Sequence, residues 1–144
     1  MAEERQGCIL NLIVCMDEQN GIMFNKRRQS RDSAVCRDVL DMIEAASLYT
    51  DRYSYRLFEE FGDGRVICCR EPALSAGRGD YCFAEDMDMT AAASKADKVI
   101  VYCWNKTYPA DRYFDVDTER FELVTQTEFE GSSHKKITKK VYVR

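Results

Sequence analysis

Two stretches of the chain are apolar at nearly every position. Residues 9–16 read ILNLIVCM and residues 98–104 read KVIVYCW, and both are rich in β-branched side chains. A strand with one wet face alternates apolar and polar residues, whereas a continuous apolar run is typical of a strand buried on both faces. We therefore predict that these two stretches form the centre of a sheet that is covered on both sides.

Between the two central strands, the pattern predicts short helices that alternate with short strands. Asp32 or Ser33 can cap a first helix, whose apolar stripe recurs at helical spacing: Val35, Val39, Met42, Ile43 and Ala46. Ser54 can cap a second helix that runs to Phe61, and a third helix is predicted over residues 87–96. The other predicted elements are strands at 48–49, 65–69 and 81–83 and a loop at 72–79.

The end of the chain carries strands with no helix between them. A polar connection over 105–118 is followed by alternating patterns at 121–125 and 137–143, which predict an antiparallel pair. Strands that alternate with helices favour a parallel sheet. The sequence therefore predicts one α/β domain over residues 1–144, with a mostly parallel central sheet and an antiparallel C-terminal edge.

Composition narrows the class of protein. The 144 residues are 45% hydrophobic and 32% charged, and the net charge is −4. A protein that is acidic overall can bind nucleic acid only through a local basic patch. No apolar run approaches the roughly 20 residues of a membrane-spanning helix, and the charged start of the chain is unlike a signal peptide. Seven cysteines, an odd number without C-x-x-C spacing, predict reduced core thiols, no metal site and a cytoplasmic protein.

Four segments of the sequence resemble the dihydrofolate reductase family. LIVCMDEQNGI resembles the family's first strand and turn, while VIVYCWNKTYPADRYF, FELVTQTEFEG and KKVYVR resemble its last three strands. The resemblance implies the family's three-layer α/β fold, with folate and NADPH lying along a cleft of the sheet. It also implies NADPH-dependent reduction of dihydrofolate, to be judged position by position.

The folate half of the cleft departs from the family pattern. Residues 28–30 (RQS) stand where the family has Leu-Pro-Trp, Val35 stands where it has an acid that supports protonation of the pterin, and Tyr102 stands where it has a threonine. A carboxylate is needed to hold the pterin and help deliver a proton near neutral pH. Asp32 and Asp38, three residues to either side of Val35, are therefore the candidate catalytic acids if the protein is an active reductase.

The cofactor half is mixed. Arg52 and Ser54 match part of the family's Gly-Arg-x-Thr segment and Arg70 matches a basic residue near its 2′-phosphate site, so these three are the candidate cofactor-binding residues. Glu85 and Asp86 replace two glycines whose N–H groups approach the pyrophosphate. Carboxylates there would repel it, since unit charges ~4 Å apart interact by roughly 4 kcal/mol at an effective dielectric near 20. The alternative interpretation is that these acids complement the dipole of a helix start.

The loop after the first strand is cationic. Lys26, Arg27, Arg28 and Arg31 lie where the family keeps its mobile substrate loop, and they are the candidate anion-binding residues. A solvated loop without a ligand is the alternative. His134, the only histidine, is interpreted as a solvated turn residue before a lysine-rich strand.

Three functions follow from these residues. The leading hypothesis is a dihydrofolate-reductase-like protein that has lost folate reduction, needs no cofactor and binds a small anionic or phosphorylated ligand. The first alternative is an active, divergent NADPH-dependent dihydrofolate reductase. The second is a nucleic-acid-associated protein that uses loop 26–31, which the net negative charge disfavours. No pattern in the chain predicts the oligomeric state or the identity of a ligand.

Overall fold

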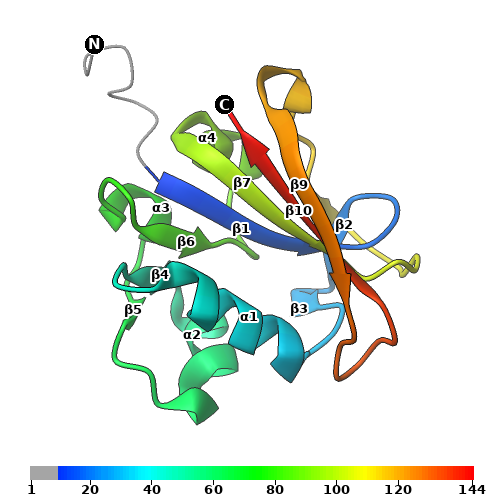
Figure 1. Ribbon diagram of the computed structural model, residues 1–144, viewed down its shortest axis with the longest axis horizontal. Helices are drawn as coiled ribbons and strands as arrows, with labels where there is room; N and C mark the ends of the chain where they lie inside the picture. The colour runs from blue at the N-terminus through cyan, green and yellow to red at the C-terminus, as the bar shows by residue number, and fades with distance from the viewer. Residues whose placement is uncertain (1–9) are drawn as a thin grey trace.

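The computed structural model describes residues 10–144, which form two sheets and a set of short helices (Figure 1). The strands are β1 (Leu10–Met16), β2 (Gly21–Phe24), β3 (Arg27–Arg28), β4 (Leu48–Thr50), β5 (Val66–Cys68), β6 (Tyr81–Phe83), β7 (Ala96–Cys103), β8 (Arg112–Tyr113), β9 (Glu122–Phe129) and β10 (Ile137–Val143). The helices are α1 (Ser33–Ile43), α2 (Arg52–Phe58), α3 (Pro72–Ser75) and α4 (Met89–Ser94), with 3-10 turns η2 (Glu59–Phe61) and η3 (Thr118–Arg120).

The larger sheet has seven strands in the order β5-β4-β6-β1-β7-β10-β9. Strands β5, β4, β6, β1 and β7 are parallel, and β10 runs antiparallel to both β7 and β9. The predicted mostly parallel sheet with an antiparallel C-terminal edge is confirmed. The two continuous apolar runs are neighbours at its centre, since β1 and β7 pair along their length.

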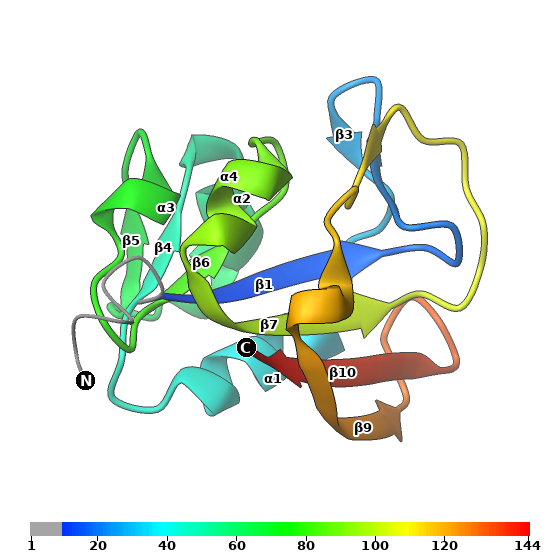
Figure 2. The ribbon, with the colours of Figure 1, turned by 90° about the horizontal axis from the view of Figure 1, so that it is seen from above.

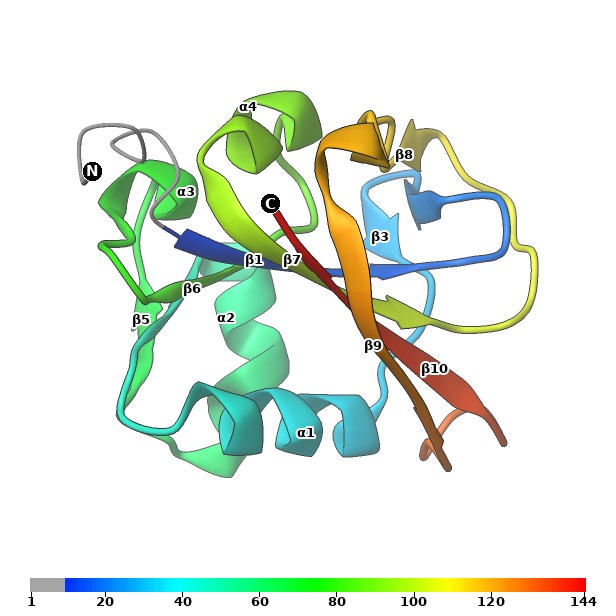
Figure 3. The same cartoon turned by 45° about the horizontal axis from the view of Figure 1, so that its top comes forward.

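The central strand separates two hydrophobic clusters. Leu10, Leu12 and Val14 of β1 pack with residues of α4 in one cluster, and Ile13 packs with residues of α1 and α2 in the other. All four side chains are fully buried. Figure 3 shows the resulting layers, with α1 and α2 below the sheet and α3 and α4 above it. A strand covered on both faces in this way needs apolar side chains at successive positions.

Aspartates set the starts of the helices. Asp32 caps α1, where its carboxylate accepts from the N–H of Val35 at 3.0 Å, as the sequence predicts. The cap of α2 is Asp51 rather than the predicted Ser54, whose N–H donates to the Asp51 carboxylate at 2.8 Å. The third predicted helix is shorter than expected because it begins only after its cap at Asp88 and because β7 already starts at Ala96.

Regular structure occurs in three segments that the sequence pattern assigned to loops. Residues 72–75 form α3, which starts with Pro72, a residue suited to the first turn of a helix. The segments 20–31 and 105–118 meet in a second sheet of order β3-β2-β8, in which Met23 of β2 pairs with Arg112 of β8. Figure 2 shows the yellow connection that follows β7 running beside the hairpin that carries β3. In this sheet β2 lies between β3 and β8, so the cationic segment is held in a three-stranded sheet.

Candidate functional site

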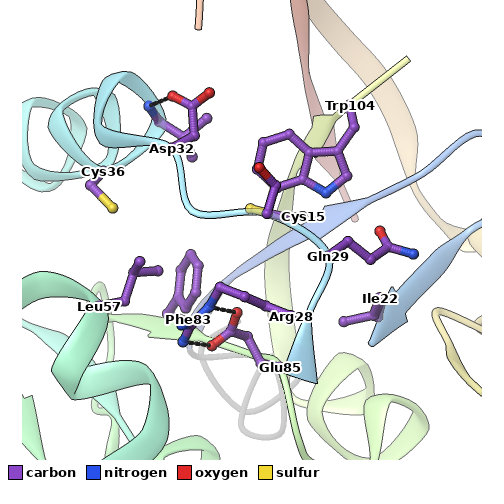
Figure 4. A pocket seen from close by; sticks show the side chains of 12 residues that line it. Cys15, Ile22, Arg28, Gln29, Asp32, Cys36, Leu57, Phe83, Glu85 and Trp104 are labelled. Carbon is purple, nitrogen blue, oxygen red and sulfur yellow. Dashed lines mark hydrogen bonds and ion pairs between the residues drawn. The ribbon is translucent and has the colours of Figure 1, made fainter. Parts of the chain in front are cut away.

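An ion pair lies at the centre of the candidate site. Arg28, at the end of β3, turns its side chain toward Glu85, just past the end of β6 (Figure 4). The guanidinium Nε donates to Oε2 and Nη2 donates to Oε1, both at 2.8 Å. The two side chains are only 11% and 5% exposed. Bidentate pairing of this kind is strong and strictly oriented.

Helix α2 holds both partners in place. The Ser54 hydroxyl donates to Glu85 Oε1 at 2.7 Å. The backbone N–H of Arg28 donates to the Tyr53 hydroxyl at 2.9 Å, and the guanidinium carbon lies 4.2 Å from the centre of the Tyr53 ring. Burial would lower the pKa of Arg28, but its hydrogen bonds to Glu85 and the charge of that carboxylate raise the pKa. The cationic loop is thereby fastened between α2 and β6.

The space beside this ion pair is nearly filled. The cavity that Arg28 and Glu85 line has a volume of about 10 Å³, which is room for one water molecule. Its other walls are mostly apolar, contributed by Ile22, Val35, Leu57, Phe83 and Trp104. Pockets for small organic ligands measure roughly 300–1,000 Å³. A pterin ring therefore has no room in this conformation.

Asp32, the first candidate acid, lies at the edge of the cavity but is already saturated with hydrogen bonds. Its carboxylate accepts from the N–H groups of Val35, Ser132 and Ser133 and from the Ser133 hydroxyl, at 2.7–3.1 Å. Burial alone would raise the pKa of Asp32, but these hydrogen bonds outweigh it and lower the pKa to about 2. A group this acidic is poorly suited to transfer a proton near neutral pH.

Asp38, the second candidate acid, is bound by other side chains. The Tyr102 hydroxyl donates to Asp38 Oδ2 at 2.7 Å, and Lys139 Nζ lies 2.8 Å from the same oxygen. Burial, and then the Asp38 charge, raise the pKa of Tyr102 well above its usual value, so its hydroxyl keeps the proton. Asp38, one helical turn after Val35, is thus hydrogen-bonded to Tyr102, and neither residue lines the cavity.

The three candidate cofactor-binding residues do not converge on one point. Ser54 is buried and donates to Glu85, whereas Arg52 is exposed at the start of α2. Arg70 lines a separate open pocket of about 330 Å³ between α3 and α4, at the carboxyl ends of β4 and β5. Four acidic residues and two basic ones line this pocket, the acids being Asp51, Glu71, Asp86 and Asp88 and the bases Arg70 and Lys95.

Glu85 and Asp86 do not cap a helix, which corrects the dipole interpretation. The N-cap of α4 is Asp88, whose carboxylate accepts from the Ala91 N–H at 3.1 Å. Glu85 instead forms the buried pair described above, and Asp86 lies 3.1 Å from Arg112 at the surface. Sequence reasoning identified Arg28 and Glu85 as separate departures from a family pattern. Their opposite charges were the one available signal that they form a pair.

The basic residues of loop 26–31 have different environments. Arg28 points inward, whereas Lys26 and Arg27 are exposed at the turn between β2 and β3. Arg31 Nη2 lies 3.8 Å from Glu60 Oε1, and both side chains are more than half exposed. The positive charge that the loop presents to solvent is therefore smaller than the sequence suggests.

His134 belongs to a hydrogen-bond chain, which corrects its interpretation as a solvated residue. Its Nε2 lies 2.5 Å from the Tyr108 hydroxyl, its Nδ1 lies 2.7 Å from the Ser133 hydroxyl, and its ring stacks on Trp104. The Ser133 hydroxyl donates to Asp32, so a neutral imidazole donates from Nδ1 and accepts from Tyr108 at Nε2. Because the serine proton goes to Asp32 and not to the imidazole, this chain does not activate a nucleophile.

Three further features bear on chemistry. Within residues 10–144 no cluster of three or more His, Cys, Asp or Glu side chains is arranged to hold a metal ion. In the same range no helix is long and apolar enough to cross a membrane. The six cysteines of this range are free thiols, and Cys8 lies outside the described residues. That all seven are reduced in the purified protein stays a prediction.

The chain matches no protein-family model and no curated protein sequence. Among solved structures it is similar to dihydrofolate reductase from Enterococcus faecalis, complexed with NADP(H) and RAB-propyl. The match has a TM-score of 0.70 and covers 96% of this chain and 97% of that chain, at 14% sequence identity. The protein therefore has the dihydrofolate-reductase-like fold that its strand sequences resemble.

Proposed function

We propose that this protein is a dihydrofolate-reductase-like protein that does not reduce dihydrofolate and that binds a small anionic ligand. The observation that carries the proposal is the bidentate, buried ion pair between Arg28 and Glu85. Both residues stand at positions that the family pattern assigns to ligand contacts. Here they contact each other, and the cavity beside them has a volume of only about 10 Å³.

In the part of the chain that the structure describes, the protein also lacks a side chain that could act as the general acid of a reductase. Val35 occupies the acid position and cannot transfer a proton. Asp32 is held as a carboxylate with a pKa of about 2, and Asp38 is bound by Tyr102 and Lys139. A general acid for a reaction near neutral pH needs a pKa near the working pH and contact with the substrate. Neither aspartate meets both conditions.

The pocket beside Arg70 is the part of the cofactor region that stays open. Its volume of about 330 Å³ lies within the range of small-molecule sites. With four acids and two bases in its lining, the pocket has a net negative charge that disfavours a pyrophosphate, and Arg70 and Lys95 are the groups that can hold a single anionic group. We infer that a small phosphorylated or carboxylated molecule binds there through Arg70, with its apolar part against Pro72, Leu74 and Met87.

A steady-state assay of NADPH oxidation with dihydrofolate tests the loss of activity. We expect no rate above background from the wild-type protein. The double variant Arg28→Leu/Glu85→Gly removes the ion pair and restores a glycine, so it should bind NADPH at least about tenfold more tightly in a fluorescence titration. Arg31→Leu is the matched control for loss of one loop charge and should leave NADPH affinity unchanged. Equal NADPH affinity of wild type and double variant would show that the ion pair does not close the site.

A thermal-shift screen of nucleoside monophosphates and sugar phosphates tests the ligand. A ligand present at 100 times its dissociation constant stabilises the folded state by about 2.7 kcal/mol. The shift should be lost in Arg70→Ala and retained in Arg78→Ala, an exposed arginine that does not line the pocket. A shift that persists in Arg70→Ala would remove this pocket from the proposal.

The fold match to a reductase bound to NADP(H) favours one second candidate, an active divergent reductase. That activity requires Arg28 and Glu85 to separate when cofactor binds. A wild-type turnover of order 1 per second, within the usual range of enzymes, would establish it. Nucleic-acid binding has less support, because Lys26, Arg27 and an Arg31 that already lies near Glu60 provide few phosphate contacts.

A further inference from the structure

A second large cavity lies on the other face of the central sheet from α1. Its volume is about 330 Å³. The sheet contributes Met16 of β1, Val101 and Cys103 of β7, and Tyr142 of β10. The connection around β8 covers it with Phe114 and Val116. Figure 3 shows β8 on the side of the sheet that carries α4, opposite α1. No residue of this cavity lines the closed cleft, so an inference about it does not depend on the function proposed above.

The floor and cover of this cavity contribute an apolar part to a lining that is otherwise polar. Met16, Val101 and Phe114 are buried members of the hydrophobic cluster on this face, and Val116 and Tyr142 pack against it. These side chains form a surface suited to a short aliphatic or aromatic body. A volume of about 330 Å³ is at the lower end of the range for small-molecule sites. The cavity therefore has the size and the lining of a site for a compact organic molecule.

One cation in the cavity has no counter-ion. Lys140 pairs with Val101 across β10 and β7, which places its side chain on the cavity face. It is half-buried, and it makes no ion pair or side-chain hydrogen bond with any residue of 10–144. Its neighbour Lys139, on the opposite face of the sheet, lies 2.8 Å from the Asp38 carboxylate. The two lysines differ in that one is neutralised by the protein and the other is not.

The acids near the cavity do not neutralise Lys140. Asp17 accepts hydrogen bonds from the N–H groups of Gln19, Gly21 and Tyr108 and from the Gln29 amide, at 2.7–3.1 Å. Glu18 is exposed in the turn that follows β1, and its carboxylate accepts a hydrogen bond from the Thr107 hydroxyl at 3.3 Å.

We propose that this cavity binds a small organic monoanion, with its carboxylate at Lys140 and its apolar body against Phe114, Val116 and Tyr142. A half-buried ammonium gains more from an anionic acceptor than from a neutral one. The polar end of the cavity, with Asn20, Asn105 and Thr118, provides hydrogen-bond partners for a polar substituent on the far side of the ligand. One lysine beside two acids favours a single negative charge over a phosphate dianion.

The test uses benzoate and hexanoate as probes, with benzamide and hexanamide as neutral counterparts of the same shape. At millimolar concentration at least one carboxylate should raise the melting temperature of the wild-type protein, and its amide should not. Lys140→Met should weaken the binding of that carboxylate by about tenfold or more, the size expected for loss of a charge-assisted hydrogen bond. Lys135→Met, which removes the same charge from an exposed turn residue, should retain full affinity.

Cysteine labelling gives a second readout at the site itself. Cys103 lines the cavity and is partly buried, whereas Cys68 is exposed and distant in the sheet order. Bound carboxylate should slow alkylation of Cys103 and leave the rate at Cys68 unchanged in the same sample. Equal binding of carboxylate and amide, full binding by Lys140→Met, or a melting-temperature shift without protection of Cys103 would each overturn the proposal. The proposal would also be overturned if neither benzoate nor hexanoate shifts the melting temperature at 10 mM, a concentration about 10-fold above a millimolar dissociation constant.

Discussion

Arg28 is the residue on which the shape of the cleft depends. Loop arginines usually extend into water, but the side chain of Arg28 is only 11% exposed. It donates two hydrogen bonds of 2.8 Å to Glu85, which also accepts one from Ser54. Breaking a buried pair by removing one partner leaves an uncompensated charge, whereas replacing both partners by apolar groups can be nearly neutral. The ion pair is therefore a source of structural specificity more than of net stability.

This difference predicts the outcome of a double-mutant cycle at the two positions. Arg28→Met should lower the free energy of unfolding by about 3–5 kcal/mol, because Glu85 stays buried without its partner. Arg28→Met/Glu85→Leu should recover most of that loss. Urea denaturation at pH 7 measures both, and Arg31→Met, which removes an exposed pair of 3.8 Å, should change stability by less than about 1 kcal/mol. A double variant less stable than the single one would contradict this account.

His134 makes the stability of the protein depend on pH in a range where other side chains titrate little. Burial lowers the pKa of His134 below its ordinary value of 6.5, with the Asp32 charge opposing and the Lys106 charge adding to the effect. The unfolded chain then binds a proton at a higher pH than the folded one, so stability increases with pH through this window. We expect stability to be complete above pH 7 and to fall as the pH drops below about 6.5.

Unfolding free energies measured between pH 5 and pH 8 check this expectation. His134→Gln should flatten the profile over that range. The wild-type and variant proteins should both lose further stability below about pH 4, because the pKa of Asp32 is lowered to about 2 and the folded carboxylate must then be protonated. A wild-type profile that is flat from pH 5 to pH 7 would rule out the burial of a neutral imidazole.

Among the elements, α1 is attached to the sheet through its cap. Asp32 accepts from Val35 in α1 and also from Ser132 and Ser133 in the turn between β9 and β10. One carboxylate thus joins a helix start to a strand connection that lies about 100 residues later in the chain. Gly131 is required at this junction, because a Cβ there would lie 2.5 Å from Asp32 Oδ2.

The two aspartate caps provide a matched comparison. Asp32→Ala should lower the free energy of unfolding by about 3 kcal/mol, since it removes a cap with a buried N–H group and two further acceptor contacts that are partly buried. Asp88→Ala removes the exposed cap of α4 and should cost about 1 kcal/mol. Chemical denaturation of the two variants under the same conditions measures the difference. Equal losses would show that the contacts to Ser132 and Ser133 add nothing to a simple cap.

The sequence pattern predicted the elements that are defined by local periodicity. The apolar runs of β1 and β7, the stripe of α1 and the alternation of β10 were sufficient for the sheet and its antiparallel edge. The small sheet was missed because β3 has two residues and β8 has two, too few for a periodic signal, and because β2 pairs with β8 far along the chain. The same reason applies to the site: Arg28 and Glu85 are 57 residues apart.

At the scale of the whole molecule, each side of the sheet contains a buried cysteine whose reactivity can measure the packing of that side. Cys82 belongs to the cluster that contains α4, and Cys36 belongs to the cluster that contains α1. Burial raises the pKa of each thiol to about 12. Because the thiolate is the reactive form, neither should be modified in the folded protein, whereas the exposed Cys68 should react at once.

Pulsed alkylation across a urea gradient, read by mass spectrometry, tests whether the two clusters unfold together. A single cooperative domain predicts the same midpoint for Cys36 and Cys82. Cys68 serves as an internal control for the reactivity of the reagent at every urea concentration. Midpoints that differ beyond error would mean that the two sides of the sheet lose their packing separately.

The Arg28–Glu85 pair also constrains the order in which the two residues arose. An arginine on a surface loop can lie in water until a partner appears, because its long side chain reaches solvent. The side chain at position 85 is only 4% exposed, just past the end of β6, so an acid there cannot reach solvent. We therefore expect that the basic residue came first and the acid second. Among naturally occurring relatives, sequences with a base at 28 and a small residue at 85 should exist, and sequences with an acid at 85 but no base at 28 should be absent.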